Sequence, residues 1–119
     1  MKYGLIFYET SAQFSERESE SAGQYWGAWS AYIDQLDDAG VLVRGAGAGL
    51  QVPGSATTLR ATAGELTIQD GPVADTKEQL AGLVVINVPS LDEAMTWAKL
   101  APCTEGGAVE VRPILPDPS

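Results

Sequence analysis

Three polar side chains that could do chemistry follow one another around a turn. Asp70 precedes a Gly-Pro pair, and Lys77 and Glu78 come shortly after it. A carboxylate at a strand end can act as a base or anchor a ligand, while an ammonium and a second carboxylate can hold an anionic substrate and move a proton. Alternatively, Asp70 accepts hydrogen bonds within its own turn, and Lys77 and Glu78 are solvated neighbours. Asp70 and Glu78 are therefore candidate catalytic residues, and both structural alternatives stay open.

Aromatic side chains form a second group of candidates. Tyr25, Trp26 and Trp29 recur at helical spacing, and together with Tyr8 they would line a pocket for a planar or apolar molecule. The same pattern is typical of a helix packed in a core or a dimer interface. Arg44 would either bind a carboxylate or pair with a neighbouring acidic residue. The candidate ligand-binding residues are Tyr8, Trp26, Trp29, Arg44 and Lys77.

Composition excludes several kinds of chemistry. The chain contains no histidine and a single cysteine, Cys103, which removes the commonest general base, most nucleophilic triads and thiolate metal clusters. We expect neither a metal nor a cofactor, and we expect Cys103 to be inert. Seven Lys and Arg against sixteen Asp and Glu give a formal net charge of −9, which disfavours nucleic acids and anionic membranes as partners.

Length and the order of apolar residues bound the organisation. The 119 residues predict one domain over 1–119, with a loose tail at 115–119. No stretch approaches the roughly 20 apolar residues of a membrane helix, and the first residues enter a strand-like run without a signal-peptide pattern. We therefore expect a cytoplasmic protein.

The first third of the chain predicts a strand followed by a helix. Residues 3–8 alternate with period two and are apolar on both faces. Residues 15–18 have the Ser-x-x-Glu pattern of a capping box, which predicts that a helix begins there. From residue 22 to 36 apolar side chains recur every three or four positions, and Gly40 is a suitable left-handed stop.

The middle of the chain predicts a strand, a loop and a hairpin. Residues 41–44 read as a strand, and the glycine-rich residues 45–54 as a loop in which no helix follows to make a dinucleotide site. Residues 57–62 and 65–70 flank Ala63-Gly64, which predicts a hairpin at an edge of the fold. Residues 76–79 are predicted to form one helical turn.

The last third predicts a buried strand, a second helix and a final strand. Residues 83–86 form an apolar run, Ser90 opens a second capping box for a helix to residue 101, and residues 108–114 alternate again. The whole order predicts an α+β domain of the ferredoxin-like, split βαβ type with an inserted hairpin. Two helices cover only one face of such a sheet, so a second copy of the chain is expected to cover the other.

The run DGPVADTKEQLAG, from Asp70 to Gly82, closely resembles the signature of the DGPF branch of the YCII-related family. The opening Met-Lys-Tyr, the Tyr8-Glu9 pair, the helix at 90–98 and the strand at 106–114 are also similar to that branch. The resemblance implies a domain that pairs through its sheets into a dimeric α/β barrel, with a cleft between sheet and helices. In that family, some members sit beside extracytoplasmic-function sigma factors and a few act as lyases or dehydrochlorinases.

Two departures from the family pattern bear on mechanism. Val73 stands where the signature usually has Phe, so the contact made by that aromatic ring is not expected here. Trp29 stands where the enzyme-like branch has a histidine that is thought to work with an aspartate. The resemblance therefore implies no His/Asp mechanism for this chain.

The leading interpretation is a cytoplasmic homodimer that binds a small organic molecule in a cleft lined by Tyr8, Trp26, Trp29 and the Asp70 loop. One alternative is a lyase or isomerase without metal or cofactor, in which Asp70 or Glu78 moves a proton while Lys77 or Arg44 stabilises negative charge. Another is a protein-interaction module linked to sigma-factor regulation.

Overall fold

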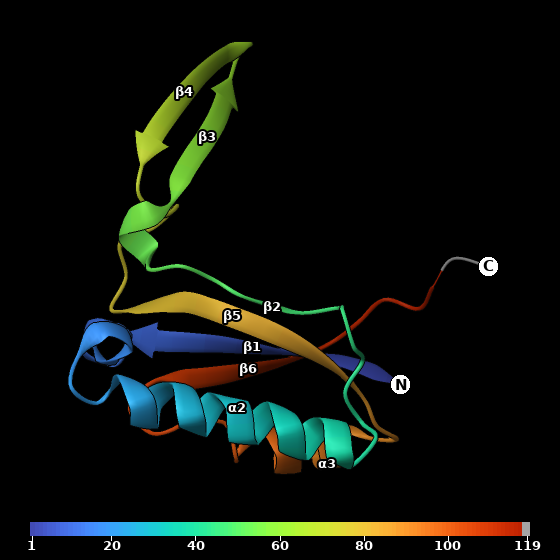
Figure 1. Ribbon diagram of the computed structural model, residues 1–119. Coiled ribbons are helices and arrows are strands. Elements are labelled where there is room, and N and C mark those ends of the chain that lie inside the picture. Colours follow the sequence, from blue (N-terminus) through green and yellow to red (C-terminus); the bar gives the residue numbers. More distant parts are fainter. Residues whose placement is uncertain (118–119) are drawn as a thin grey trace.

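A four-stranded antiparallel sheet with helices on one face forms the body of the protein. The structure is a computed structural model that describes residues 1–117 (Figure 1). The strands β1 (Lys2–Thr10), β5 (Glu78–Asn87) and β6 (Ala108–Pro113) make most of the sheet, and β2 (Ala48–Gly49) adds a short edge. Their order is β2-β5-β1-β6, and each neighbouring pair is antiparallel. This is the ferredoxin-like α+β arrangement that the sequence predicts.

The core lies between the sheet and the helices. In β1 the side chains of Tyr3, Leu5 and Phe7 alternate onto the helix-covered face, and all three are buried. Leu5, Leu36 and Ile86 are fully buried there, one from β1, one from a helix and one from β5. Burying such apolar side chains is the main free-energy gain of folding.

The long helix α2 (Ala22–Asp38) confirms the helix predicted from residue 22. Its buried residues include Tyr32 and Leu36, and the Tyr32 hydroxyl donates to the Trp97 carbonyl over 2.9 Å. This bond joins α2 to α3 beneath the sheet. Gly40 follows the helix with φ of +73°, the left-handed conformation that glycine adopts most readily.

The second helix, α3 (Leu91–Ala98), begins where the sequence predicts but is shorter. The Ser90 side chain accepts a hydrogen bond from the Glu93 amide at 3.2 Å, which caps the helix. The prediction that it runs to residue 101 is wrong, because a tighter turn follows in which the Ala101 amide bonds to the Ala98 carbonyl at 3.1 Å. Within residues 1–117, no helix is long and apolar enough to cross a membrane.

The predicted capping box at residues 15–18 is wrong. The helix α1 (Ser11–Ser15) begins directly after β1, and Thr10 caps it in a reciprocal box with Gln13. Ser15 already has helical backbone angles, and its hydroxyl donates to the Ser11 carbonyl instead. A short 3-10 turn, η1 (Glu16–Glu18), follows.

The sheet edge after α2 also differs from the prediction. Residues 41–44 form no regular strand, because only one bridge joins them to β5, between Leu42 and Ile86. Gly45 then turns the chain with φ of +76°, and pairing resumes at β2, inside the predicted loop. The residues from Gly45 to Gly49 are here called the glycine strap. They lie so close to β5 that a Cβ at Gly47 would collide with the β5 backbone, which requires glycine at that position.

The hairpin has the predicted bounds and forms a sheet of its own. Strands β3 (Thr57–Thr62) and β4 (Glu65–Asp70) pair antiparallel around Ala63 and Gly64, whose φ angles of +52° and +84° are those of a two-residue hairpin turn. A 3-10 turn, η2 (Pro53–Ser55), precedes it. The hairpin projects from the side of the main sheet opposite the helices (Figure 1).

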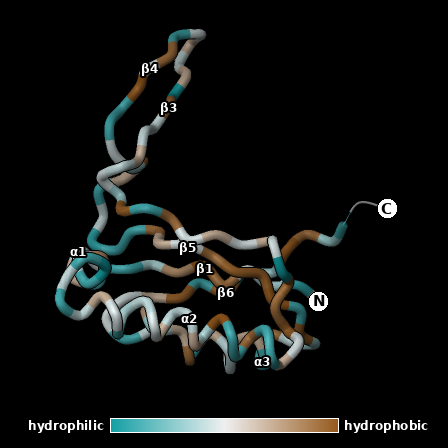
Figure 2. Tube along the Cα trace, in the orientation of Figure 1, coloured by the Kyte–Doolittle hydropathy of each residue, from teal (hydrophilic) through white to brown (hydrophobic). Residues whose placement is uncertain are grey.

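The hairpin has one apolar and one polar face. Leu59 pairs with Ile68 and Ala61 with Leu66, so these four side chains share a face, while Thr58 and its alternating neighbours lie on the other. In Figure 2, hydrophobic residues are visible on β4 of the hairpin as well as along β5 of the main sheet. Leu59, Leu66 and Ile68 are 61%, 68% and 74% exposed.

The segment after the hairpin contains no helical turn at 76–79, so that prediction is wrong. Glu78 instead begins β5 and pairs with Thr10, and the strand continues through Gly82. The side chains of Thr76 and Gln79 hydrogen-bond to nearby carbonyls and hold the preceding loop. Of the tail predicted at 115–119, residues 118 and 119 lie outside the described part of the chain.

Candidate functional site

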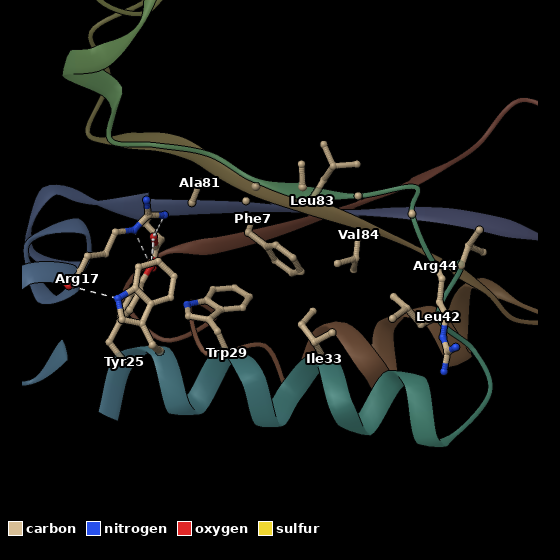
Figure 3. Close-up of a pocket in the computed structure, with 18 residues that line it drawn as sticks. Phe7, Arg17, Tyr25, Trp29, Ile33, Leu42, Arg44, Ala81, Leu83 and Val84 are labelled. Carbon is tan, nitrogen blue, oxygen red and sulfur yellow. Dashed lines mark hydrogen bonds and ion pairs between the residues drawn. The ribbon is translucent and has the colours of Figure 1, made fainter. Parts of the chain in front are cut away.

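A cavity of about 330 Å³ lies between α2, the sheet and the glycine strap (Figure 3). Most of its wall is apolar. Phe7 and Val84 contribute from the sheet, Trp29 and Ile33 from α2, and Leu42 from the chain that leads to the strap. A volume of this size suits a small organic molecule.

Local structure explains how these side chains converge. Tyr25, Trp29 and Ile33 are spaced by four residues, so they lie along one face of α2. Trp29 packs edge-on against Phe7, with ring centroids 4.8 Å apart and an angle of 63° between the rings. Edge-to-face contact of this kind fixes both rings and gives the cavity a stable wall.

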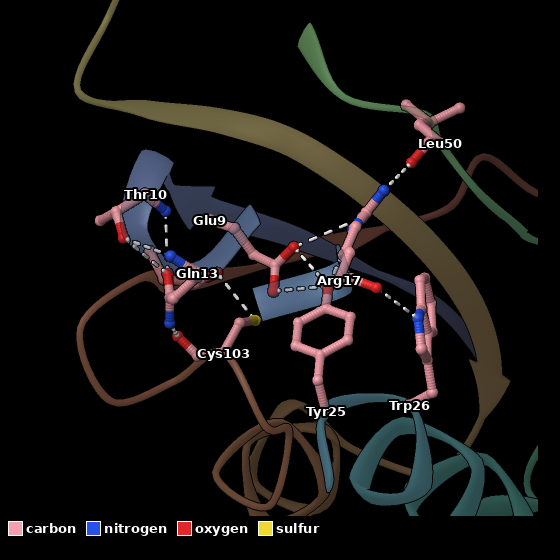
Figure 4. Close-up of polar contacts among 9 residues, drawn as sticks. Glu9, Thr10, Gln13, Arg17, Tyr25, Trp26, Leu50 and Cys103 are labelled. Carbon is pink, nitrogen blue, oxygen red and sulfur yellow. Dashed lines mark hydrogen bonds and ion pairs between the residues drawn. The ribbon is translucent and has the colours of Figure 1, made fainter. Parts of the chain in front are cut away.

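At one end of the cavity the lining includes polar side chains that are themselves almost fully buried. Glu9 is 1% exposed, and the Tyr25 hydroxyl shares its one proton between the two carboxylate oxygens of Glu9, at 2.8 and 2.9 Å (Figure 4). Arg17 donates from Nε to the Tyr25 oxygen at 3.1 Å, and its Nη2 lies 3.4 Å from Glu9 Oε1. Glu9, Tyr25 and Arg17, here called the polar triad, thus form a buried ion pair joined by a hydroxyl.

The guanidinium of Arg17 contacts three aromatic rings and a backbone carbonyl. It lies over the rings of Phe14, Trp26 and Tyr25, at 4.7, 5.4 and 5.8 Å from their centroids. Its Nη1 donates to the Leu50 carbonyl at 2.6 Å. Because cation, rings and carbonyl constrain one another, the Arg17 side chain keeps a fixed position beside Glu9.

Burial sets the protonation of the groups around the triad. Burial, with a further contribution from the Glu9 carboxylate, raises the pKa of Tyr25 to about 12, so its hydroxyl is protonated at neutral pH and donates to Glu9. Burial also raises the pKa of the Cys103 thiol to about 12. A thiol in that state is a poor nucleophile, as expected for Cys103.

Three of the residues predicted from the sequence line this cavity. Trp29 forms its wall, and Trp26 lines it beside the triad, with Nε1 donating to the Arg17 carbonyl at 3.3 Å. Arg44 lines it near the strap, but its guanidinium makes two hydrogen bonds to Asp37 at 2.8 and 2.7 Å. Of the two roles foreseen for Arg44, the structure has the pairing with an acidic neighbour.

The other predicted residues lie elsewhere. Tyr8 alternates onto the sheet face away from the helices, where it shares a shallow depression with Lys77, Glu78 and Glu110. Its hydroxyl donates to Glu110 at 3.3 Å, and burial raises the pKa of Tyr8. The structure therefore brings Tyr8, Lys77 and Glu78 together, but away from the cavity that Trp26, Trp29 and Arg44 line.

Asp70 stands apart from both groups. It ends β4 on the projecting hairpin, opposite Thr57, and is exposed. Val73, which replaces the usual Phe of the signature, is 65% exposed. Within residues 1–117, no three Asp, Glu or Cys side chains are grouped so that they could hold a metal ion.

Sequence reasoning missed Glu9 and Arg17. A signal for Glu9 was present, because it continues the alternation of Tyr3, Leu5 and Phe7 and therefore had to point into the core. A charged residue on a buried face needs a partner, and the partner here is Arg17. No local pattern identifies Arg17, since α1 and η1 together place it beside the end of β1.

Fold and sequence agree on the class of protein. The sheet order and the helices on one face define a ferredoxin-like α+β domain. The chain matches the model of the YCII-related domain over residues 1–117, and it belongs to that family. It is also similar to a protein of Rhizobium meliloti (strain 1021) named "Uncharacterized protein R00369", with 37% identity over 118 residues that cover 96% of this chain and 92% of that protein.

Proposed function

We propose that this YCII-related protein is a cytoplasmic homodimer, of the DGPF type, that binds a small organic molecule in the cavity beneath the glycine strap. The observation that carries the proposal is a wall of apolar side chains that ends in a buried ion pair. Binding sites for small molecules typically combine such a wall with a few fixed polar groups that orient the ligand. The net charge of −9 disfavours nucleic acids as alternative ligands.

Filling the cavity tests this proposal. Val84 points into the cavity from β5 (Figure 3), so Val84→Phe places a ring where the ligand is proposed to sit. Val73→Phe is the matched control, because it makes the same change at an exposed position. We expect native mass spectrometry of the purified protein to show a bound small molecule in the wild type and in Val73→Phe, and none in Val84→Phe.

The possible results separate clearly. Retention of the molecule by Val84→Phe would place the ligand elsewhere and contradict the proposal. Circular dichroism spectra of the two variants check that each keeps the fold. A wild-type protein that carries nothing, and gains no thermal stability from any member of a library of small aromatic compounds, would also contradict it.

Two apolar surfaces support the homodimer. On the sheet face away from the helices, Ile6 pairs with Leu83, and Figure 3 shows Leu83 pointing away from α2. The hairpin projects on the same side of the sheet (Figure 1), and its residues Leu66 and Ile68 are exposed. An isolated two-stranded hairpin is marginally stable in water, so burial of its apolar face against a second copy would stabilise both chains.

Adjacent hairpin residues provide the test of the dimer. Ile68→Glu places a charge on the apolar face, and Thr67→Glu places the same charge on the polar face. Light scattering should show a dimer for the wild type and Thr67→Glu, and a monomer for Ile68→Glu. A monomeric wild type would overturn the pairing, and a dimeric Ile68→Glu would exclude the hairpin from the interface.

The enzyme alternative stays a prediction for Asp70 and Glu78, with Lys77 or Arg44 stabilising charge. The observation in its favour is the depression that holds Glu78 and Lys77 beside Tyr8. Once a bound molecule is identified, its turnover by the wild type is compared with turnover by Glu78→Gln and Asp70→Asn. Unchanged turnover in both variants would remove these carboxylates as acid or base.

A further inference from the structure

The polar triad indicates which ligand the cavity takes, and this inference rests on the proposed function. We propose that the ligand is an uncharged aromatic compound of one or two rings whose hydroxyl group donates a hydrogen bond to Glu9. Three properties of the site support it: unused acceptor capacity on Glu9, the balance of charge at the polar end, and an indole donor in the wall.

Glu9 retains capacity to accept a further hydrogen bond. A carboxylate offers about four acceptor positions on its two oxygens. Within residues 1–117, Oε1 accepts from Tyr25 and faces Arg17, whereas Oε2 accepts only from Tyr25, at 2.9 Å. Glu9 also lines the cavity, and we assign this remaining position to a donor on the bound molecule.

The charge at this end of the cavity is already balanced. The side chains of Glu9 and Arg17 are 2% and 11% exposed and face each other at 3.4 Å. A charged head group would meet attraction from one member of this neutral pair and repulsion from the other, so it would lose its hydration without a net opposite charge to compensate. An uncharged hydroxyl avoids this penalty and still forms a bond to a charged acceptor, which is stronger than a neutral one.

The aromatic wall favours a planar ligand. Trp29 and Phe7 present fixed rings, and aromatic pairs gain more than the burial of their area alone. The indole nitrogen of Trp29 is turned toward the end of the cavity where Arg17 and Tyr25 lie (Figure 3). An indole N–H only donates, so a ligand hydroxyl, which both accepts and donates, complements Trp29 and Glu9 together.

A matched pair of probes tests the donor directly. 2-Naphthol and 2-methoxynaphthalene share two rings and an acceptor oxygen, but only the naphthol donates. By calorimetry we expect the naphthol to bind wild-type protein about tenfold more tightly, the difference that one hydrogen bond to a charged group supplies. 2-Naphthoate, which carries a negative charge, should bind more weakly than the naphthol.

Variants locate the effect at Glu9. Glu9→Gln should reduce the affinity for 2-naphthol about tenfold and leave that for the ether unchanged. Glu65→Gln, an exposed carboxylate on the hairpin, should change neither. Should Glu9→Gln fail to fold, the two probes on the wild type still decide.

The outcomes distinguish this inference from the proposed function. Equal affinities of the naphthol and its ether for the wild type would overturn the donor requirement while leaving binding in the cavity intact. Tighter binding of 2-naphthoate would overturn the argument from charge. If none of the three probes binds while the purified protein carries a molecule that Val84→Phe loses, the inference fails and the proposed function stands.

Discussion

The helix-covered side of the main sheet and the projecting hairpin bury similar apolar residues to very different extents. On the helix-covered side, Leu36 is 0% exposed. On the projecting hairpin, Leu66 is 68% exposed although it belongs to an equally regular element. The first side is complete within one chain, because α2 and α3 supply its cover. The hairpin has apolar residues at the right alternation on one face, and no other part of residues 1–117 covers Leu66 or Ile68, which is the observation behind the proposed dimer.

Truncating one leucine in each region should change the free energy of unfolding by very different amounts. Leu36→Ala should lower the free energy of unfolding by about 3 kcal/mol, because it removes a fully buried side chain and leaves a cavity. Leu66→Ala in the monomeric Ile68→Glu background should change it by less than about 0.5 kcal/mol. Urea unfolding measures both values. A large loss for Leu66→Ala would show that the hairpin is packed within its own chain.

Alkaline pH should act on the main sheet and its helices but not on the hairpin. The pKa of Tyr25 rises from the ordinary 10.0 to about 12 in the folded protein. Between these values the unfolded chain loses the proton that the folded chain keeps, so stability is complete below pH 10 and falls as the pH rises toward 12. The hairpin strands contain no tyrosine. Urea unfolding at a series of pH values should show a shallower fall in Tyr25→Phe, and an equal fall would contradict the assignment.

The smallest predicted change in stability comes from a pair of threonine substitutions, one in each region. Thr10→Ala removes the cap of α1 and should cost about 1 kcal/mol of stability. Thr62→Ala makes the same change at the exposed end of β3, where we expect less than about 0.5 kcal/mol. Thermal unfolding followed by circular dichroism resolves the difference. Equal effects would show that the side chain of Thr10 contributes nothing as a cap.

The sequence predicted those elements whose signals are local. The two-residue turn at Ala63 and Gly64 determined both hairpin strands to the residue, and helical periodicity identified α2. The errors at residues 15–18 and 76–79 also have a physical cause. At 76–79, pairing with Thr10 makes Glu78 the first residue of β5. At 15–18, the helix has already begun at Ser11, because Thr10 at the end of β1 caps it.

The candidate site was predictable only in part. Trp26 and Trp29 were found because an aromatic stripe on a helix is visible in sequence. Glu9 and Arg17 were not connected, since their partnership depends on how α1 and η1 return the chain to the end of β1. Tyr8 was assigned to the same cleft as Trp29. Successive side chains in a strand point to opposite faces, however, so Phe7 contacts Trp29 while its neighbour Tyr8 points away. Such relations are properties of the tertiary structure.

The glycine strap has a consequence for how this cavity can change during evolution. Gly47 and Gly82 face the backbone of the opposite strand so closely that a side chain at either position would force the strands apart. One wall of the cavity is therefore built from main chain, whose shape is the same whatever ligand is selected. Variation that reshapes the cavity must then occur at side chains of the other walls, such as Trp29 and Ile33 on α2 or Val84 on β5, while the strap provides a constant surface.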